Sequence, residues 1–210
     1  MEINWIETLI GFGFSVLAST MVMVVAYLWK IRDLLEKSNF KNQKHAEKQI
    51  IEDIKRSSTL RVYTMCGSTF SNVDEKNGSE IARKVFFDKD LKQKYLVSCK
   101  NNSQNIEKRQ TELPQKKGDR TLQEKIETSI ENFKNVINFN KNNREIRYHK
   151  DKVGFRLIIC DDCLYLSHQE KGKYGKDTKI QRITSGTPAY INFSVFFDNL
   201  WKEHEHTSLL

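Results

Sequence analysis

An uncharged apolar run near the N-terminus constrains this chain more than any other feature. From Leu9 to Trp29 the sequence reads LIGFGFSVLASTMVMVVAYLW, without a charged residue. A helix needs about 20 such residues to cross a bilayer, and aromatic rings such as Trp5 and Trp29 favour the membrane interface. The acidic start of the chain does not fit a cleaved signal peptide. The sequence therefore predicts a transmembrane anchor over residues 1–30.

The basic residues around this run predict its orientation. Lys30, Arg32 and Lys37 follow it directly, whereas no Lys or Arg precedes it. Cytoplasmic flanks of membrane helices carry the excess of basic residues. We therefore expect a single-pass protein of the inner cell membrane, in contact with the lipid bilayer, whose remaining domain faces the cytoplasm.

Small residues recur along the apolar run at Gly11, Ser15 and Ser19. A spacing of four residues places them on one side of a helix, where small side chains let another backbone come close. This ridge predicts helix packing in a homo-oligomer. The alternative is the ordinary Gly and Ser content of a membrane span.

The remainder of the chain predicts an α/β domain with a mixed sheet flanked by helices. A juxtamembrane helical stalk and first domain helix are expected at 31–57, the domain at 58–203 and a frayed tail at 204–210. Strand, helix and strand at 60–65, 79–88 and 94–98 indicate a parallel pair. The polar stretch 100–119 predicts a loop, and an amphipathic helix follows from Thr121. Later strands are expected at 145–149, 155–160 and 163–167, then a basic excursion at 169–188 and an apolar helix.

One hairpin carries the residues that most resemble a catalytic motif. The stretch from Gly154 to Ser167 reads GFRLIICDDCLYLS, in which two apolar strands are joined by a turn at Asp161. The element order and this hairpin resemble one half of the phospholipase D superfamily, which carries His-x-Lys, four further residues and Asp. Arg156 falls at the lysine position, Asp161 keeps the spacing, and Ser167 lies near a small hydroxyl position. Gly154 falls where the histidine belongs.

The resemblance implies that this domain lacks the family's chemistry. Cleavage in that family passes through a covalent phosphohistidine, and glycine has no side chain that can attack phosphorus. We therefore assign no catalytic residue and expect a domain that is not an enzyme. The alternative is a membrane-tethered nuclease or phospholipase with a rearranged site, in which His149 or His168 acts with Arg156 and Asp161.

Loss of the nucleophile leaves an anion-binding site in place. Arg156 offers a planar fork to phosphate, and the small-residue turn Gly67-Ser68-Thr69 follows a predicted strand, where backbone N–H groups can bind an anion. With Asp161 and Ser167 these residues form the predicted site for a nucleotide or other phosphate-bearing ligand. The alternative is that Arg156 pairs with Asp161 or Asp162 and only ties the hairpin.

The cysteines do not predict a metal site or a cofactor. Cys66, Cys99, Cys160 and Cys163 are spread over predicted strands, and no second Cys-x-x-Cys or His pair accompanies the spacing of the last two. A site of four thiolates would require all of these strand ends to meet. Buried structural cysteines are the expectation.

The function expected from these features is that of a membrane-anchored, inactive phospholipase D-like sensor or effector. It would bind a phosphate-bearing ligand or a partner protein and relay this to the membrane helix, as in bacterial defence signalling. The chain also has an excess of eight basic over acidic residues, with a basic run at 171–182. A basic nucleic-acid-binding membrane protein is therefore a further alternative, for which steep salt dependence of binding is expected.

Overall fold

The computed structural model describes residues 19–25, 27, 38–73, 79–114, 118–139 and 143–204. The chain divides into two compact units, Met1–Asn39 and Phe40–Leu210. The predicted boundaries after residues 30, 57 and 203 stay predictions. The second unit contains the sheet, its helices and all the residues of the predicted ligand site.

The predicted membrane anchor is corrected by this structure. Among the described residues, no helix combines the length and the apolar character that crossing a bilayer requires. A span needs about 20 consecutive residues, whereas the described helical residues of the predicted run are 19–25 and 27. The predicted transmembrane helix and single-pass inner-membrane location are therefore corrected, whereas contact with lipid stays a prediction. Of the predicted packing ridge, Gly11 and Ser15 lie outside the described residues, and Ser19 is exposed.

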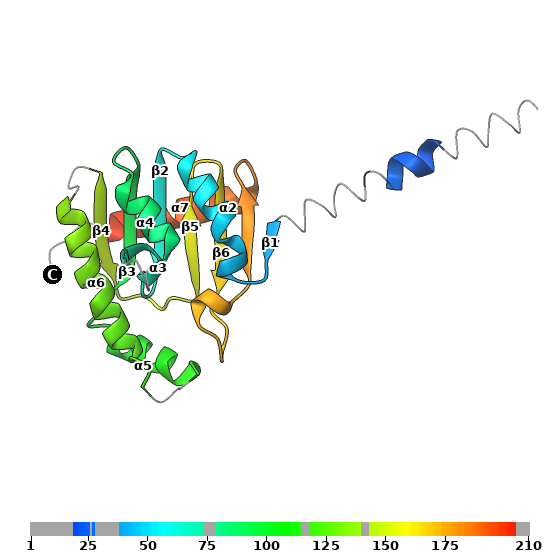
Figure 1. Cartoon of the computed structure of the whole chain (residues 1–210). Helices are drawn as coiled ribbons and strands as arrows, with labels where there is room; N and C mark the ends of the chain where they lie inside the picture. The colour runs from blue at the N-terminus through cyan, green and yellow to red at the C-terminus, as the bar shows by residue number, and fades with distance from the viewer. Residues whose placement is uncertain are drawn as a thin grey trace, which may run out of the picture. The chain divides into compact units, whose positions relative to one another are not determined.

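A seven-stranded mixed sheet forms the centre of the second unit, in the order β1-β7-β6-β5-β2-β3-β4 (Figure 1). β2, β3 and β4 are parallel, and β5, β6 and β7 continue the sheet as antiparallel neighbours. The α/β class with a mixed sheet and the parallel pair follow the prediction. The strands are β1 Asn39–Phe40, β2 Thr59–Thr64, β3 Lys92–Ser98, β4 Arg144–His149, β5 Phe155–Ile159, β6 Cys163–His168 and β7 Ile180–Thr184.

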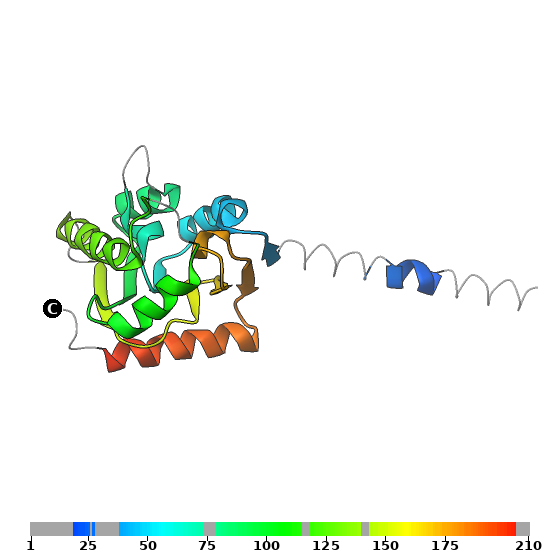
Figure 2. The same cartoon turned by 90° about the horizontal axis from the view of Figure 1, so that it is seen from below.

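Helices cover both faces of this sheet, because its central strands are apolar on both sides. α2 (Gln43–Lys55), α4 (Glu80–Phe87) and α6 (Leu122–Phe139) lie on one face, and α7 (Pro188–Glu203) lies on the other (Figure 2). Leu157, Ile158 and Ile159 of β5 are all buried, as expected for a strand between two helical layers. The short α3 (Ser68–Ser71) and α5 (Ser103–Glu112) follow β2 and β3.

Side-chain caps explain where several helices begin. Asn42 Oδ1 accepts a hydrogen bond from the His45 amide at 3.2 Å at the start of α2. Thr187 Oγ1 likewise accepts from the Tyr190 amide at 3.3 Å before α7, whose first residue is Pro188. Such caps satisfy backbone N–H groups that have no partner within the helix.

Two segments differ from the sequence-based prediction. The predicted loop at 100–119 contains α5, which is polar and buries Ile106 and Arg109. The basic excursion at 169–188 contains β7, which pairs antiparallel with β6. Both elements depend on partners distant in sequence: Arg109 donates to the carbonyl oxygens of Glu170 and Lys173 at 3.1 and 2.8 Å. Local periodicity does not reveal such contacts.

Candidate functional site

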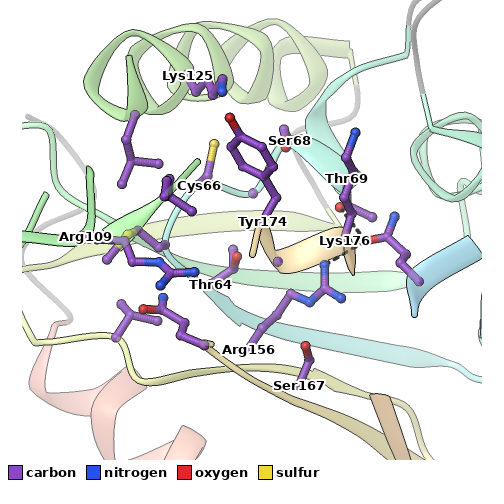
Figure 3. A pocket seen from close by; sticks show the side chains of 18 of the residues that line it. Thr64, Cys66, Ser68, Thr69, Arg109, Lys125, Arg156, Ser167, Tyr174 and Lys176 are labelled. Atoms are coloured by element: carbon purple, nitrogen blue, oxygen red, sulfur yellow. Dashed lines mark hydrogen bonds between the residues drawn. The ribbon is translucent and has the colours of Figure 1, made fainter. Parts of the chain in front are cut away.

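A cavity of about 560 Å³ opens at the carboxyl end of β2. Its wall is formed by the residues after β2, the start of β5, the end of β6, the N-terminal part of α2, parts of α5 and α6, and the segment 174–176 (Figure 3). Ligands of open α/β sheets bind outside the carboxyl ends of the strands. The position of this cavity therefore matches the place where such a fold binds its ligand.

Five of the six predicted ligand-binding residues line this cavity. Gly67, Ser68 and Thr69 follow β2, and Arg156 and Ser167 are cross-strand partners on β5 and β6. Because paired residues of neighbouring strands project to the same face, Arg156 and Ser167 lie on the α2 side of the sheet. The structure brings these five residues together, and ligand binding by them stays a prediction.

Asp161 lies at the other end of the hairpin and is not part of the cavity wall. Its Oδ2 accepts hydrogen bonds from the Ser58 amide at 2.7 Å and the Ser58 hydroxyl at 2.8 Å, and its Oδ1 accepts one from Thr59. Burial would raise the pKa of Asp161, but these hydrogen bonds lower it overall. Asp161 therefore fastens the hairpin turn to the start of β2. Asp161 follows Arg156 by five residues, and an extended strand advances about 3.3 Å per residue, so the two side chains lie at opposite ends of the hairpin.

Arg156 is the most unusual residue of the cavity. Its Nη1 donates to Gln43 Oε1 at 2.8 Å, whereas its buried Nη2 has no hydrogen-bond partner among the described residues. It forms no ion pair with a described acidic side chain, so the predicted alternative pairing with Asp161 or Asp162 does not form. Burial lowers the pKa of Arg156 to about 10, which leaves the guanidinium charged at neutral pH. A desolvated cation without a counter-ion favours an anion beside it.

The hydroxyl groups near Arg156 differ in their availability. Thr178 Oγ1 donates to the Gly175 carbonyl at 2.9 Å and lies 2.5 Å from Ser167 Oγ, so the proton of Ser167 is used in that bond. Thr69 donates to Gln43 Oε1 at 3.2 Å. The exposed Ser68 hydroxyl makes no hydrogen bond within the described part of the chain. Ser68 is therefore the hydroxyl best able to donate to an anion.

The charges that line the cavity are mainly positive. Lys125 and Lys176 line it together with Arg156, and neither lysine forms an ion pair with an acid in the described ranges. Glu47 and Asp119 are the acidic residues of the wall. Figure 3 shows the Arg156 guanidinium directed toward Thr69 and Lys176. Cations without carboxylate partners in its wall make the cavity attractive to anions.

Of the two histidines considered for catalysis, His168 lines the cavity together with Arg156, whereas His149 does not. His168 pairs with Phe155, which contacts Phe193 of α7 at a ring-centroid distance of 5.7 Å. His149 is fully buried and its ring lies 4.9 Å from that of Tyr63, which contacts α7 as well. Successive strand residues point to opposite faces, so Phe155 and His168 project away from the Arg156 and Ser167 pair, but His168 stands at the end of β6, where it borders the cavity.

Gly67 shapes the wall where β2 ends. It has a φ of 74°, and a Cβ atom there would lie 2.7 Å from Cε2 of the fully buried Phe133. Both the left-handed backbone and the close approach of the ring require glycine. This explains why a small residue stands at the turn.

Replacing Gly67 by alanine should lower the free energy of unfolding by about 2 kcal/mol, from backbone strain together with the clash against Phe133. Urea denaturation checks this. Gly186→Ala is the matched control, because Gly186 has a φ of 81° and a Cβ atom there would have no neighbouring atom within 4 Å. A loss of stability at Gly67 no larger than that at Gly186 would contradict the role of the Phe133 contact.

The four cysteines do not gather around a metal. Cys160 and Cys163 are fully buried, and Cys66 lies 3.5 Å from the Ser129 hydroxyl. Within the described ranges, no group of three or more His, Cys, Asp or Glu side chains is arranged to hold a metal ion. The cysteines serve packing where they are buried.

Sequence reasoning missed Gln43, Lys125 and Tyr174 as residues of the site. Gln43 begins α2 and accepts from both Arg156 and Thr69, which no local pattern indicates. Tyr174 lies in the segment for which the sequence predicted only a basic excursion. Its hydroxyl lies 2.8 Å from Asp119 and its ring lies 4.8 Å from Lys125 Nζ.

Comparisons with known proteins give little further information. No family model and no curated protein matches this chain. Among solved structures, the chain is similar to TrmBL2, an archaeal chromatin protein described as showing a novel mode of DNA binding. The identity is 13%, the likeness covers 95% of this chain and 69% of that one, and the TM-score is 0.46. A likeness of this size assigns neither a family nor a function.

Proposed function

We propose that this domain binds a small phosphate-bearing ligand in the cavity at the end of β2 and does not cleave it. The observation that carries this proposal is the buried Arg156 Nη2, which has no acceptor among the described residues. A charge-assisted hydrogen bond from a guanidinium to phosphate contributes more than a neutral one, and the fork geometry suits phosphate oxygens. An anion at this position would offset the cost of the buried charge.

The surrounding residues support the same proposal. Ser68 supplies a hydroxyl donor, and Lys176 supplies a second cation near the guanidinium. Gln43 holds Arg156 through a neutral amide oxygen, so it fixes the guanidinium without cancelling its charge. A site that only stabilised the fold would be expected to pair the arginine with a carboxylate.

Binding without cleavage is supported by the lack of a histidine at the position that the phospholipase D pattern gives to its nucleophile. Gly154 stands at the histidine position of the phospholipase D pattern, and we propose the domain as an inactive relative of that superfamily. The His149 ring lies against Tyr63 on the α7 side, and the His168 ring contacts Phe155 at 6.3 Å, although His168 also lines the cavity. A displacement at phosphorus would need an attacking group on the same side as the guanidinium.

Isothermal titration of the full chain with pyrophosphate tests the proposal. We expect one binding event per chain, and Arg156→Gln should weaken it by at least about tenfold, because a hydrogen bond to a charged group contributes about 1.5–3 kcal/mol. Arg156→Lys should retain part of the affinity, since the charge remains while the fork is lost. Glu47→Gln should strengthen binding, because it removes a negative charge from the wall.

Arg56→Gln is the matched control, because Arg56 is exposed at the far end of α2 from Gln43. It removes the same charge without touching the cavity. Equal weakening by Arg56→Gln and Arg156→Gln would show that only the net charge matters, and the proposed site would then be rejected. Hydrolysis of a phosphodiester by the pure protein would reject binding without cleavage.

A further inference from the structure

We infer that the ligand of this cavity is a nucleotide whose base lies against the ring of Tyr174. The inference rests on the proposed anion site at Arg156 and adds the chemical class of the rest of the ligand. It comes from an aromatic side chain that stands in the wall of a cationic cavity (Figure 3).

Tyr174 is held in place from both ends. Its hydroxyl lies 2.9 Å from the Pro114 carbonyl oxygen and 2.8 Å from Asp119 Oδ2. The preceding carbonyl, that of Lys173, accepts a hydrogen bond from the buried Arg109 at 2.8 Å. A ring fixed in this way loses little conformational entropy when a planar group packs on it.

A cation already lies over this ring. Lys125 Nζ is placed above the Tyr174 ring, 4.8 Å from its centre. The ring is partly buried, and no aromatic ring of the described residues contacts it. A base that stacks on this ring would take the place of the Lys125 ammonium over its face, and the displaced ammonium would then be available to the phosphate.

The composition of the cavity favours a nucleotide over other phosphate compounds. The cavity volume of about 560 Å³ lies within the roughly 300–1,000 Å³ that small-ligand pockets occupy. A sugar phosphate or a polyphosphate would use the cations but would not use the ring of Tyr174. Single-stranded nucleic acid stacks successive bases on several aromatic platforms, whereas Phe155, the other aromatic residue of the wall, packs against α7.

Calorimetric titration of the full chain with adenosine 5′-monophosphate and with ribose 5-phosphate tests this inference. The two compounds share sugar and phosphate and differ by the base. We expect the first to bind about tenfold more tightly, the usual effect of one base–aromatic stack. Tyr174→Leu should remove that difference and change ribose 5-phosphate binding less than twofold. Tyr174→Phe keeps the ring and should preserve most of the difference.

The outcomes separate this inference from the proposed function. Equal affinity for both compounds, together with weakening by Arg156→Gln, would reject the nucleotide and leave the phosphate site standing. A preference for the nucleotide that survives Tyr174→Leu would reject the role of the ring. Failure of both compounds and of pyrophosphate to bind would reject the proposed function itself. If a thymidine hexanucleotide bound far more tightly than the mononucleotide, a free nucleotide would be rejected as the ligand in favour of single-stranded DNA.

Discussion

Replacing Asp53 by alanine should lower the free energy of unfolding by about 3–5 kcal/mol, the usual cost of removing one partner of a buried ion pair. Asp53 is 6% exposed, and its Oδ2 accepts from Tyr165 Oη at 2.5 Å, Arg182 Nε at 2.7 Å and Cys163 Sγ at 3.1 Å. These contacts join α2 to β6 and β7. Without the carboxylate, three buried or partly buried donors lose their acceptor at once.

Guanidinium denaturation of the wild type and the variant measures this loss. Glu52→Ala on the same helix is the control, and it should change stability by less than about 0.5 kcal/mol. A double-mutant cycle with Arg182→Met should give a coupling energy of at least about 1 kcal/mol, because the two side chains share one network. Additive effects of the two substitutions would contradict the network.

The same network predicts a dependence on pH. Burial would raise the pKa of Asp53, but hydrogen bonds from Arg182, Tyr165 and Cys163 and the charge of Arg182 lower it below its ordinary value of 3.8. A carboxyl whose pKa is lowered by folding contributes stability that is present above the unfolded-state pKa. This contribution should therefore be complete above pH 3.8 and disappear as the pH falls further.

Acidification from pH 6.5 to pH 4 should destabilise the wild type by about 3 kcal/mol more than it destabilises His149→Phe. His149 is fully buried, and neither ring nitrogen has a hydrogen-bond partner among the described residues. Burial lowers the pKa of His149 to about 4, against the opposing effect of Asp151, whose Oδ2 lies 3.7 Å from Nδ1, while nearby His204 lowers it further.

The sign of this effect follows from proton binding. Between pH 6.5 and pH 4 the unfolded chain binds a proton at His149 and the folded chain does not, so stability rises with pH in this window. Phenylalanine fills a similar volume and cannot titrate. Urea unfolding at several pH values checks this, with the exposed His168→Gln as control. Parallel pH profiles for wild type and His149→Phe would contradict the expected pKa.

Much of the sheet could be predicted from local pattern. The hairpin of β5 and β6 followed from two apolar runs around an acidic turn, and the parallel β2–β3 pair followed from strand, helix and strand with short connections. These elements depend on near neighbours in the chain. α5 and β7 could not be predicted in this way. α5 is polar and is held by Arg109 against the carbonyl oxygens of Glu170 and Lys173, and β7 is defined by its pairing with β6.

The candidate site was predicted in part. Arg156 was identified because it stands at the lysine position of the phospholipase D pattern. Gly67-Ser68-Thr69 was identified because three small residues follow a predicted strand. The motif also included Asp161, which the strand carries to the opposite end of the hairpin, where it binds Ser58 and Thr59. The spacing of residues in the sequence does not tell which residues of a hairpin lie at the end where the ligand cavity opens.

By itself, the sequence determined the α/β class, the hairpin and the residue types available for binding, because these depend on apolar periodicity and on local turn chemistry. The prediction of a membrane span from the apolar run was wrong, since no described helix meets the length that a bilayer requires. The tertiary structure alone decided that Gln43, Tyr174 and Lys125 line one cavity with Arg156 and that His149 lies outside its wall. Contacts between distant segments and the alternation of strand faces determine these positions, and neither can be read from neighbouring residues.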